Sequence, residues 1–178
     1  MKIRIIGYAG SGKTSLAIKL QEKYQIQGIS LDDYLKIKDK EQRFHDLNHR
    51  LSELDHWIVE GVQVSQWTKQ SFKEADIVVI LDYPIYICQF RVCKRAIKQF
   101  FEKGRTFTQR QKALKRMVKL FKWNHRFKLR LPDIKTNLYY QPTKVMILEE
   151  PSDEYRLHDY IKKNAPMDIK KIKRKKRR

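Results

Sequence analysis

Residues 2–16 read KIRIIGYAGSGKTSL, and this stretch decides how the rest of the sequence is interpreted. Lys2–Ile6 is rich in isoleucine, which is typical of a buried strand, and apolar residues at helical spacing begin at Leu16. The segment between them, residues 7–14, fits the pattern GxxxxGK[ST] of the phosphate-binding loop, or P-loop. Its glycines let the backbone turn tightly, so that successive N–H groups and the positive end of the following helix point at phosphate oxygens.

The P-loop pattern indicates that the ligand is a nucleoside triphosphate, with ATP and Mg²⁺ as the expected cofactors. In this pattern Lys13 reaches the β- and γ-phosphates, and Thr14 gives its hydroxyl to Mg²⁺. We expect the following residues to bind the nucleotide: Gly7, Gly10, Ser11, Gly12, Lys13, Thr14 and Ser15.

Four further apolar runs have the length of strands, at 29–31, 57–59, 77–81 and 144–148. Helical patterns lie between and after them, at 85–101, at about 109–130 and at 153–163, whereas 34–55 is polar and is expected to be helical in pieces. Strands that alternate with helices predict a parallel sheet covered on both faces. The expected fold class is therefore α/β, a P-loop NTPase with three α/β/α layers and a five-stranded parallel sheet.

Acidic residues follow two of these strands, at the carboxyl edge where a parallel sheet binds its ligands. Glu60 ends the run Trp57–Val59, and we expect it to hold Mg²⁺ together with Thr14; a solvated acid at a strand end is the alternative. Asp32 follows the second strand and could accept the proton of an attacking hydroxyl, or could be the N-cap of the next helix. Asp33 is the better candidate for that cap.

Arg91 and Arg95 are four residues apart on the helix after the fourth strand, so they share one helical face. Two guanidinium groups at this place can flank a nucleotide base and its phosphates, and a solvated face is the alternative. Gly104 then breaks the helix, and Gly104-Arg105 marks a short loop that could close over the site. The residues expected to act in catalysis are Lys13, Asp32, Arg91, Arg95 and Arg105.

Four stretches carry a resemblance to a known family: IIGYAGSGKTSLAIKL from Ile5, SLDD from Ser30, WIVEG from Trp57 and LDYPIYICQFRVCKR from Leu81. With them, residues 2–105 resemble the nucleoside-monophosphate kinases, and within that group the adenylate-kinase-like DNA topology modulation proteins of bacteria. KVMILEE near 144–150 adds weaker support. The resemblance implies a P-loop kinase domain at 1–165 with a short lid at about 102–109.

The resemblance also implies roles for single residues. Glu60 stands where this family usually has an Asp that organises Mg²⁺, and the longer Glu is expected to coordinate through water. Arg91 and Arg95 match an arginine pair that contacts the adenine ring and the phosphates. Arg105 matches the start of the lid, and Asp32 matches an acid that follows the second strand in the topology-modulation and uridine-kinase-like proteins.

One departure from the family concerns the phosphoryl acceptor. Adenylate kinases have an acceptor-binding arginine shortly after the Asp-Gly pair that matches Glu60-Gly61. Here Gly61 is followed by Val-Gln-Val-Ser, which contains no arginine. Arg43, Arg50 or the 109–130 helix are the candidates to replace it. The expected function is transfer of the γ-phosphoryl group of Mg-ATP to a small acceptor, for which a nucleoside or a nucleotide is a candidate.

Positive charge is concentrated in two segments of the chain. There are 40 Lys and Arg residues against 20 Asp and Glu, which gives a formal net charge of +20. Residues 94–130 carry fourteen of the basic residues and a single acid, and residues 169–178 read IKKIKRKKRR. Such segregation favours a polyanionic partner. Because a run of like charges cannot bury apolar area, residues 166–178 are expected to form a basic disordered tail.

The rival function is a nucleotide-gated regulator that binds DNA or RNA weakly through 94–130 and 169–178. Phe100, Phe107, Phe121 and Trp123 are interleaved with basic residues, as in surfaces that stack on bases. The alternatives are that these aromatic residues belong to the core and that the tail is merely solvated. The sequence has no recognisable nucleic-acid module, which favours the kinase.

Composition narrows the class of protein further. A chain of 178 residues with 41% hydrophobic residues can bury the core of one domain. Its longest apolar run, 77–81, is far shorter than a membrane span, and the N-terminus lacks the apolar stretch of a signal peptide. We therefore expect a cytoplasmic protein without a membrane partner. Cys88 and Cys93 are expected to be reduced thiols on one helix.

Overall fold

Five parallel strands form the centre of the molecule. The computed structural model describes residues 1–166 and 169. The strands are β1 (Lys2–Gly7), β2 (Gln27–Ser30), β3 (Trp57–Glu60), β4 (Ile77–Leu81) and β5 (Lys144–Leu148), and they make one sheet in the order β2-β3-β1-β4-β5. Every neighbouring pair is parallel. The predicted α/β class and five-stranded parallel sheet are confirmed.

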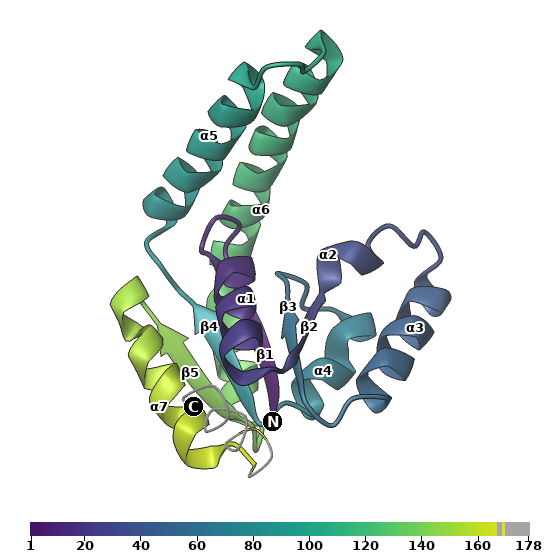
Figure 1. Ribbon diagram of the computed structural model, residues 1–178, viewed down its shortest axis with the longest axis vertical. Helices are drawn as coiled ribbons and strands as arrows, with labels where there is room; N and C mark the ends of the chain where they lie inside the picture. The colour runs from purple at the N-terminus through teal and green to yellow at the C-terminus, as the bar shows by residue number, and fades with distance from the viewer. Residues whose placement is uncertain (167–168, 170–178) are drawn as a thin grey trace, which may run out of the picture.

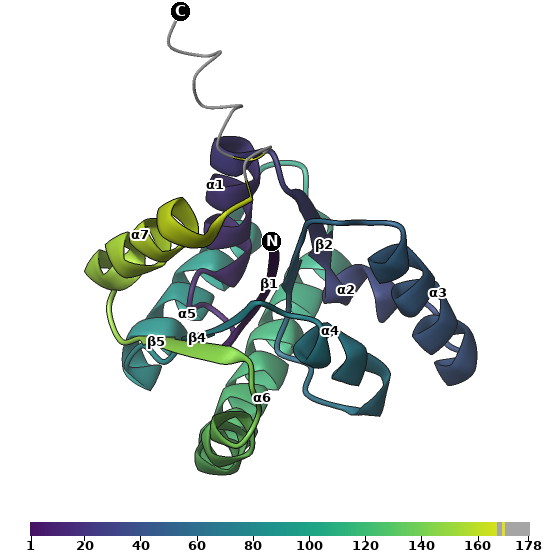
Figure 2. The ribbon, with the colours of Figure 1, turned by 90° about the horizontal axis from the view of Figure 1, so that it is seen from below.

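Helices cover both faces of this sheet (Figures 1 and 2). On one face lie α1 (Lys13–Tyr24) and α7 (Glu154–Asn164), which Tyr24 and His158 link by a side-chain hydrogen bond of 3.0 Å. On the other face lie α4 (Lys69–Lys73) and the C-terminal half of α6 (Phe107–Tyr139). With both faces covered, β1 and β4 are buried along nearly their whole length, and the predicted three-layer arrangement is confirmed.

Residues 31–52 form two helices beyond the β2 edge of the sheet (Figure 1). The single turn α2 (Leu31–Tyr34) follows β2 directly, and α3 (Lys40–Ser52) begins after a short connection. Asp39 caps α3, because its side chain accepts a hydrogen bond of 2.7 Å from the backbone N–H of Gln42. The polar segment 34–55 is therefore mostly one capped helix. Two 3-10 turns, at Gln66–Thr68 and Pro151–Asp153, complete the fold.

A helical hairpin projects from the sheet (Figure 1). It consists of α5 (Ile85–Phe101) and the N-terminal half of α6, which pack against each other. Gly104 lies in the loop that joins them, with a φ of +82° that favours glycine. The segment 102–109, which the resemblance identifies as the lid, comprises this loop and the first residues of α6. It lies at the far end of the hairpin, away from the sheet.

The basic helix expected at 109–130 is longer than its charge pattern indicates. The observed α6 has 33 residues and contains Pro132, a residue that usually ends or kinks a helix. Beyond the basic block, Phe127, Leu131, Ile134 and Leu138 are buried, and they recur in steps of three and four residues. Their packing against the sheet extends the helix through the proline to Tyr139.

No helix among residues 1–166 is long and apolar enough to cross a membrane. Cys88 and Cys93 are free thiols on α5, as predicted. Of the tail predicted to be disordered at 166–178, the structure describes Pro166 and Ile169, and Ile169 is buried against the core. The other residues of that prediction lie outside the described part of the chain.

Candidate active site

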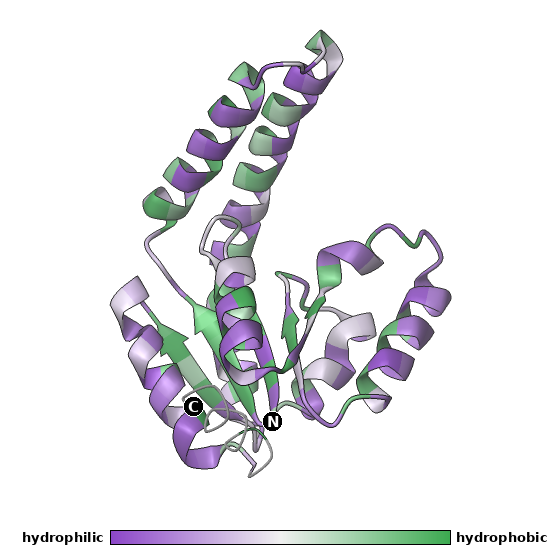
Figure 3. Ribbon diagram, viewed as in Figure 1, coloured by the Kyte–Doolittle hydropathy of each residue, from purple (hydrophilic) through white to green (hydrophobic). Residues whose placement is uncertain are grey.

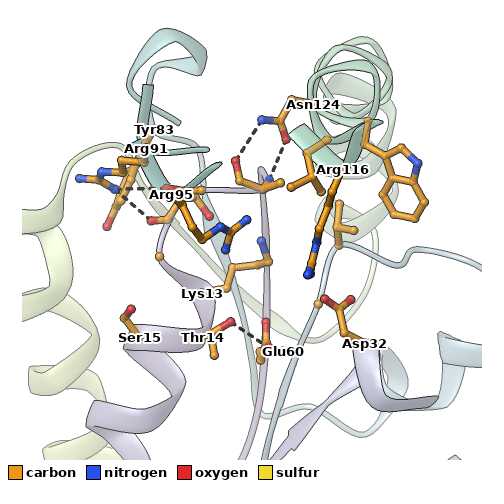
Figure 4. A pocket seen from close by; sticks show the side chains of 18 of the residues that line it. Lys13, Thr14, Ser15, Asp32, Glu60, Tyr83, Arg91, Arg95, Arg116 and Asn124 are labelled. Atoms are coloured by element: carbon orange, nitrogen blue, oxygen red, sulfur yellow. Dashed lines mark hydrogen bonds between the residues drawn. The ribbon is translucent and has the colours of Figure 1, made fainter. Parts of the chain in front are cut away.

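The P-loop joins β1 to α1 at the carboxyl edge of the sheet (Figure 4). Helix α1 begins at Lys13, so its positive end faces the loop, as the pattern predicts. Gly10 has a φ of +88°, and a Cβ at this position would lie 2.3 Å from the backbone oxygen of Cys88. Only glycine therefore allows the loop to approach α5 this closely.

Lys13 lies inside the loop and is only 9% exposed. Its ammonium group donates a hydrogen bond of 2.7 Å to the backbone oxygen of Tyr8. Burial lowers the pKa of Lys13 from its ordinary 10.5 to about 8, although the nearby carboxylates of Glu60 and Asp32 act in the opposite direction. A buried, poorly solvated cation at this place is well suited to bind phosphate oxygens.

Glu60 ends β3 beside the first turn of α1. One of its carboxylate oxygens accepts hydrogen bonds from Thr14 Oγ1 at 3.2 Å and from Ser30 Oγ at 2.8 Å. The parallel register explains the contact with Ser30, which is the partner of Glu60 on β2, whereas Thr14 reaches the same carboxylate from the first turn of α1. The predicted pair of Thr14 and Glu60 is therefore brought together, within hydrogen-bond distance (Figure 4).

The donor set around Glu60 fits Mg²⁺. Among the described residues there is no cluster of three or more His, Cys, Asp or Glu side chains that could form a metal cage. Mg²⁺ does not require one, because it is usually bound by one or two carboxylates, substrate phosphates and water. One carboxylate and two hydroxyl groups, from Glu60, Thr14 and Ser30, are oxygen donors of the kind that this ion prefers.

Asp32 lies in the first turn of α2, where its side chain lines the same cavity as the P-loop. The prediction that Asp32 or Asp33 caps this helix is wrong: the N-cap residue is Ser30, because the helix already begins at Leu31. Asp32 Oδ1 instead accepts a hydrogen bond of 3.0 Å from the side-chain amide of Gln63. Its carboxylate is thus oriented by a residue that follows β3.

A buried arginine that the sequence patterns do not identify supports this part of the site. Arg4 on β1 is fully buried and donates hydrogen bonds to four backbone oxygens, among them those of Gly61 at 3.1 Å and Gln63 at 2.8 Å. Its guanidinium also lies 4.8 Å from the ring centroid of Phe72. Burial lowers the pKa of Arg4 to about 9, and the charge of Glu60 opposes this change. Arg4 therefore fixes the segment that carries Gln63.

Asn124 on α6, also missed from sequence, holds the P-loop from the other side. Its side chain accepts a hydrogen bond of 2.7 Å from the backbone N–H of Ala9 and donates one of 3.0 Å to the backbone oxygen of the same residue (Figure 4). Asn124 is 1% exposed. The signal in the sequence was its position, because it lies in step with the buried Phe127 and Leu131 on a face that is otherwise apolar.

Arg91 and Arg95 both line the cavity, on the side of α5. Arg91 lies over the ring of Tyr83 at 5.8 Å and reaches the backbone oxygens of Gly10 and Ser11 at 3.5 Å. Figure 4 shows Arg95 extending into the cavity toward the P-loop. Two of the predicted arginines are therefore beside the phosphate-binding loop.

Arg105 is not brought to the cavity. It lies in the loop at the tip of the hairpin, where it forms an ion pair with Glu102, and it is absent from the cavity lining. The nine residue steps from Phe107 to Arg116 span about 14 Å of helix, which separates the tip from the part of α6 that lines the cavity. In this structure the hairpin is straight, and its loop does not cover the site (Figure 1).

Side chains of α6 line the side of the cavity that faces Asp32. The cavity has a volume of about 970 Å³, and Figure 4 shows Arg116 pointing from α6 toward Asp32. The other side chains that α6 contributes are Lys115, Lys119, Leu120, Trp123 and Asn124. The charge pattern predicts basic residues on this helix but does not indicate which of them face the P-loop.

Two of the three candidates for the missing acceptor arginine are engaged elsewhere. Arg43 donates to the backbone oxygens of Tyr34 and Ile37, and Arg50 forms an ion pair with Glu53. Neither arginine lines the cavity. Of the three candidates only the α6 helix supplies an arginine to the cavity, and that residue is Arg116.

Comparisons with known proteins identify the fold. No protein-family model and no curated protein sequence matches the chain. Among solved structures, a shikimate kinase from Acinetobacter baumannii in complex with shikimate is similar, with a TM-score of 0.54 and 16% identity over 93% of this chain and 95% of that one. Deoxyadenosine kinase from M. mycoides with bound dATP has a TM-score of 0.55 and 16% identity, over 90% of this chain and 98% of that one. The fold is that of the P-loop kinases. At these identities the likeness shows the fold alone, so the resemblance to DNA topology modulation proteins stays a prediction.

Proposed function

We propose that this protein is a P-loop kinase that transfers the γ-phosphoryl group of Mg-ATP to the hydroxyl of a small acceptor. The observation that carries the proposal is one continuous cavity lined by Lys13, Thr14 and Glu60 on one side and by Asp32 on the other. Phosphate-binding groups and a potential proton acceptor thus share one space. The same fold in known kinases supports this assignment. We also propose that the protein is a member of the topology-modulation group and that it is cytoplasmic.

The donor half of the cavity is built to bind the triphosphate. Lys13 and the N–H groups of the loop bind the β- and γ-phosphates, and Arg91 and Arg95 neutralise phosphate charge from α5. Thr14 and Glu60 are the residues that would hold Mg²⁺, which neutralises charge on the phosphates when it is bound. Because phosphoryl transfer needs little covalent help, positioning and charge neutralisation are the main contributions of these residues.

Asp32 is placed to handle the acceptor hydroxyl. In the transfer, the acceptor oxygen forms a bond to the γ-phosphorus, and the bond between that phosphorus and the bridging oxygen breaks, which releases ADP. The proton of the hydroxyl passes to the Asp32 carboxylate. Gln63 donates to one oxygen of this carboxylate at 3.0 Å and leaves the other available for the acceptor.

The acceptor half of the cavity suits a ring that bears a negative group. Trp123 and Leu120 offer apolar surface, and Arg116 and Lys119 add positive charge on the same helix face. A nucleoside or a nucleotide combines a flat base with hydroxyl groups, and a nucleotide adds the phosphate. These two acceptors are therefore the first to test.

The experiment is a screen of ATP consumption by the purified chain with Mg²⁺. Nucleosides, nucleoside monophosphates and sugars are offered singly, and ADP and the phosphorylated product are both measured. We expect turnover that depends on one class of acceptor and disappears in Lys13→Ala. The proposal is contradicted if no acceptor supports turnover and Lys13→Ala binds ATP with the same affinity as the wild type.

The nucleic-acid alternative finds less support in the positions of the aromatic residues. Trp123 lines the cavity, Phe107 is exposed at the hairpin tip, and Phe100 packs against Phe101 and Arg110. These side chains do not form one stacking surface. This alternative would be favoured if the chain binds DNA with an affinity that rises as the salt concentration falls, and if no small acceptor is found.

A further inference from the structure

One face of the helical hairpin exposes a continuous set of large apolar side chains. Along both helices hydrophobic residues recur up to the tip (Figure 3). Tyr86, Phe90, Phe101 and Phe107 are between 67% and 73% exposed. We call the whole set the outer hairpin face, which consists of Tyr86, Phe90, Cys93, Ile97 and Phe101 on α5 and Phe107, Leu114, Val118 and Phe121 on α6. A monomer seldom leaves so many large apolar residues together in water.

The two rows of side chains lie on the same side of the hairpin. On α5, Ile97 follows the buried Ala96 by one position, and on α6 Leu114 follows the buried Ala113 in the same way. One position is a rotation of about 100° around a helix. Because α5 and α6 run in opposite directions and bury Ala96 and Ala113 between them, equal rotations bring both rows to one side.

The cavity lies on the opposite side of the hairpin. Its arginines stand one position before the buried residues: Arg95 precedes Ala96, and Arg91 precedes the buried Val92. The same rotation in the other sense directs them away from the outer hairpin face. A partner on that face therefore leaves the cavity open.

We propose that the outer hairpin face docks on the same face of a second copy of this chain, so that two hairpins form a four-helix bundle. From the exposure of its side chains, the face offers about 800 Å² of apolar surface, since an aromatic side chain alone can bury 150–250 Å². A stable interface of standard size buries about 800 Å² on each partner. The area therefore matches what a dimer needs.

The spacing within the face fits helices as the partner. The steps on α5 are four, three, four and four residues, and those on α6 include seven, four and three. Steps of three and four are the pattern by which helices interlock side chains in bundles. An amphipathic helix on a lipid surface has the same spacing, so the salt dependence of binding is what separates these two partners, whereas nucleic-acid bases do not stack on the aliphatic Ile97, Leu114 and Val118.

The charges beside the face give the dimer a distinctive salt dependence. Lys94 and Lys98 flank the row on α5, and Lys122 flanks the row on α6. Two copies bring these like charges near each other, so added salt screens a repulsion and strengthens the dimer. Binding to an anionic surface, an acidic protein or nucleic acid weakens with salt instead. The sign of the salt effect thus separates the second copy from the other partners.

The test is sedimentation equilibrium of the full chain and two variants. Ile97→Lys puts a charge in the outer hairpin face, and Ile18→Lys makes the same change on α1 at a residue of similar exposure, 50% against 54%. We expect the wild type and Ile18→Lys to have twice the monomer mass of 21.6 kDa, and Ile97→Lys to dissociate at least tenfold more readily. Raising NaCl from about 0.1 to about 0.5 M is expected to tighten the wild-type dimer.

Alkylation of Cys93 gives a second measurement that does not depend on mass. Cys93 lies within the face, whereas Cys88 is buried inside the molecule. Labelling of Cys93 by a maleimide is expected to slow as the wild type is concentrated, and to stay constant in Ile97→Lys. The proposal is overturned by a wild type that stays at 21.6 kDa at about 100 µM, by equal effects of the two lysine substitutions, or by salt-sensitive binding of the monomer to anionic vesicles.

Discussion

The side chain of Asn124 accepts a hydrogen bond of 2.7 Å from the backbone N–H of Ala9 and donates one of 3.0 Å to its backbone oxygen, although the two residues are 115 positions apart in the sequence. Through this pair of hydrogen bonds the hairpin helix α6 holds the P-loop directly. A side-chain amide is the group best suited to the task, because it offers a donor and an acceptor side by side. The position of α6 and the shape of the phosphate-binding loop are therefore coupled.

Replacement of Asn124 is expected to weaken ATP binding. Asn124→Leu keeps the volume but leaves the N–H and the oxygen of Ala9 without their partner, a loss of about 1–3 kcal/mol, or about 5- to 150-fold in affinity. Asn124→Asp keeps only the acceptor, so an intermediate loss is expected. Calorimetric titration with Mg-ATP measures both. An affinity for ATP within twofold of the wild type in Asn124→Leu shows that the loop keeps its shape without this contact.

Lys13→Met is expected to abolish phosphoryl transfer and at the same time to stabilise the ligand-free protein. Methionine has nearly the length of lysine but no charge that must be desolvated. The lowering of the Lys13 pKa from 10.5 to about 8 corresponds to about 3 kcal/mol at neutral pH, from which the lost hydrogen bond to Tyr8 subtracts about 1 kcal/mol. Denaturant unfolding at pH 7 measures the difference. A less stable Lys13→Met would show that the ammonium group is favourably paired even without nucleotide.

The same pair of proteins gives a pH dependence with a definite sign. The folded state loses the Lys13 proton near pH 8, whereas the unfolded state keeps it until about pH 10.5. Between these values the unfolded state binds more protons, so the stability contributed by this residue rises with pH. The advantage of Lys13→Met over the wild type is therefore expected to be full below pH 8 and to vanish toward pH 10.5. Comparing the two proteins cancels other groups that titrate in this range.

Gln63→Leu tests whether the orientation of Asp32 matters for turnover. The substitution removes the donor to Asp32 Oδ1 but leaves the backbone oxygen of Gln63 free to accept from Arg4. We expect kcat to fall about tenfold with little change in the KM for ATP, since a positioning contact of about 1–1.5 kcal/mol is lost at the acceptor side. Asp32→Asn is the matched control and is expected to lose much more. If kcat falls equally in Gln63→Leu and Asp32→Asn, Gln63 does more than orient the Asp32 carboxylate.

The P-loop and the parallel sheet are predictable from local patterns in the sequence. The P-loop needs a strand, a glycine-rich turn and a helix in succession, and Thr14 in the first turn of that helix reaches Glu60 at the end of β3. Because the strand order follows from few possible topologies, the parallel sheet was predictable as well. Arg91 and Arg95 lie beside the loop because a helix that follows a strand end starts at this edge of the sheet, while their roles toward a nucleotide stay a prediction.

The residues that escaped prediction act across long separations in sequence. Arg4 looks like an interruption of an apolar strand until its acceptors, such as the backbone oxygen of Gln63, are known from the fold. Arg116 belongs to a helix with basic residues on several faces, and only the packing of α6 against the sheet selects the one that faces Asp32. Arg105 lies far from the site because α5 and α6 form a long hairpin that projects from the sheet. No local pattern in the sequence indicates how far such a hairpin projects.

Arg116 and Arg105 are therefore expected to differ in their effect on the reaction. Arg116 points toward Asp32 inside the cavity, whereas Arg105 is paired with Glu102 at the hairpin tip. Loss of a charged contact in a cavity costs about 2–4 kcal/mol, so Arg116→Ala is expected to lower kcat/KM for the acceptor about 30- to 1000-fold. Arg105→Ala, an identical change outside the cavity, is expected to alter it by less than threefold. Steady-state kinetics with the acceptor found in the screen measure both variants. A large loss in Arg105→Ala with a small loss in Arg116→Ala would show that the tip bends over the cavity during turnover, as the resemblance to adenylate kinases implies, and that Arg116 does not contact the reacting groups.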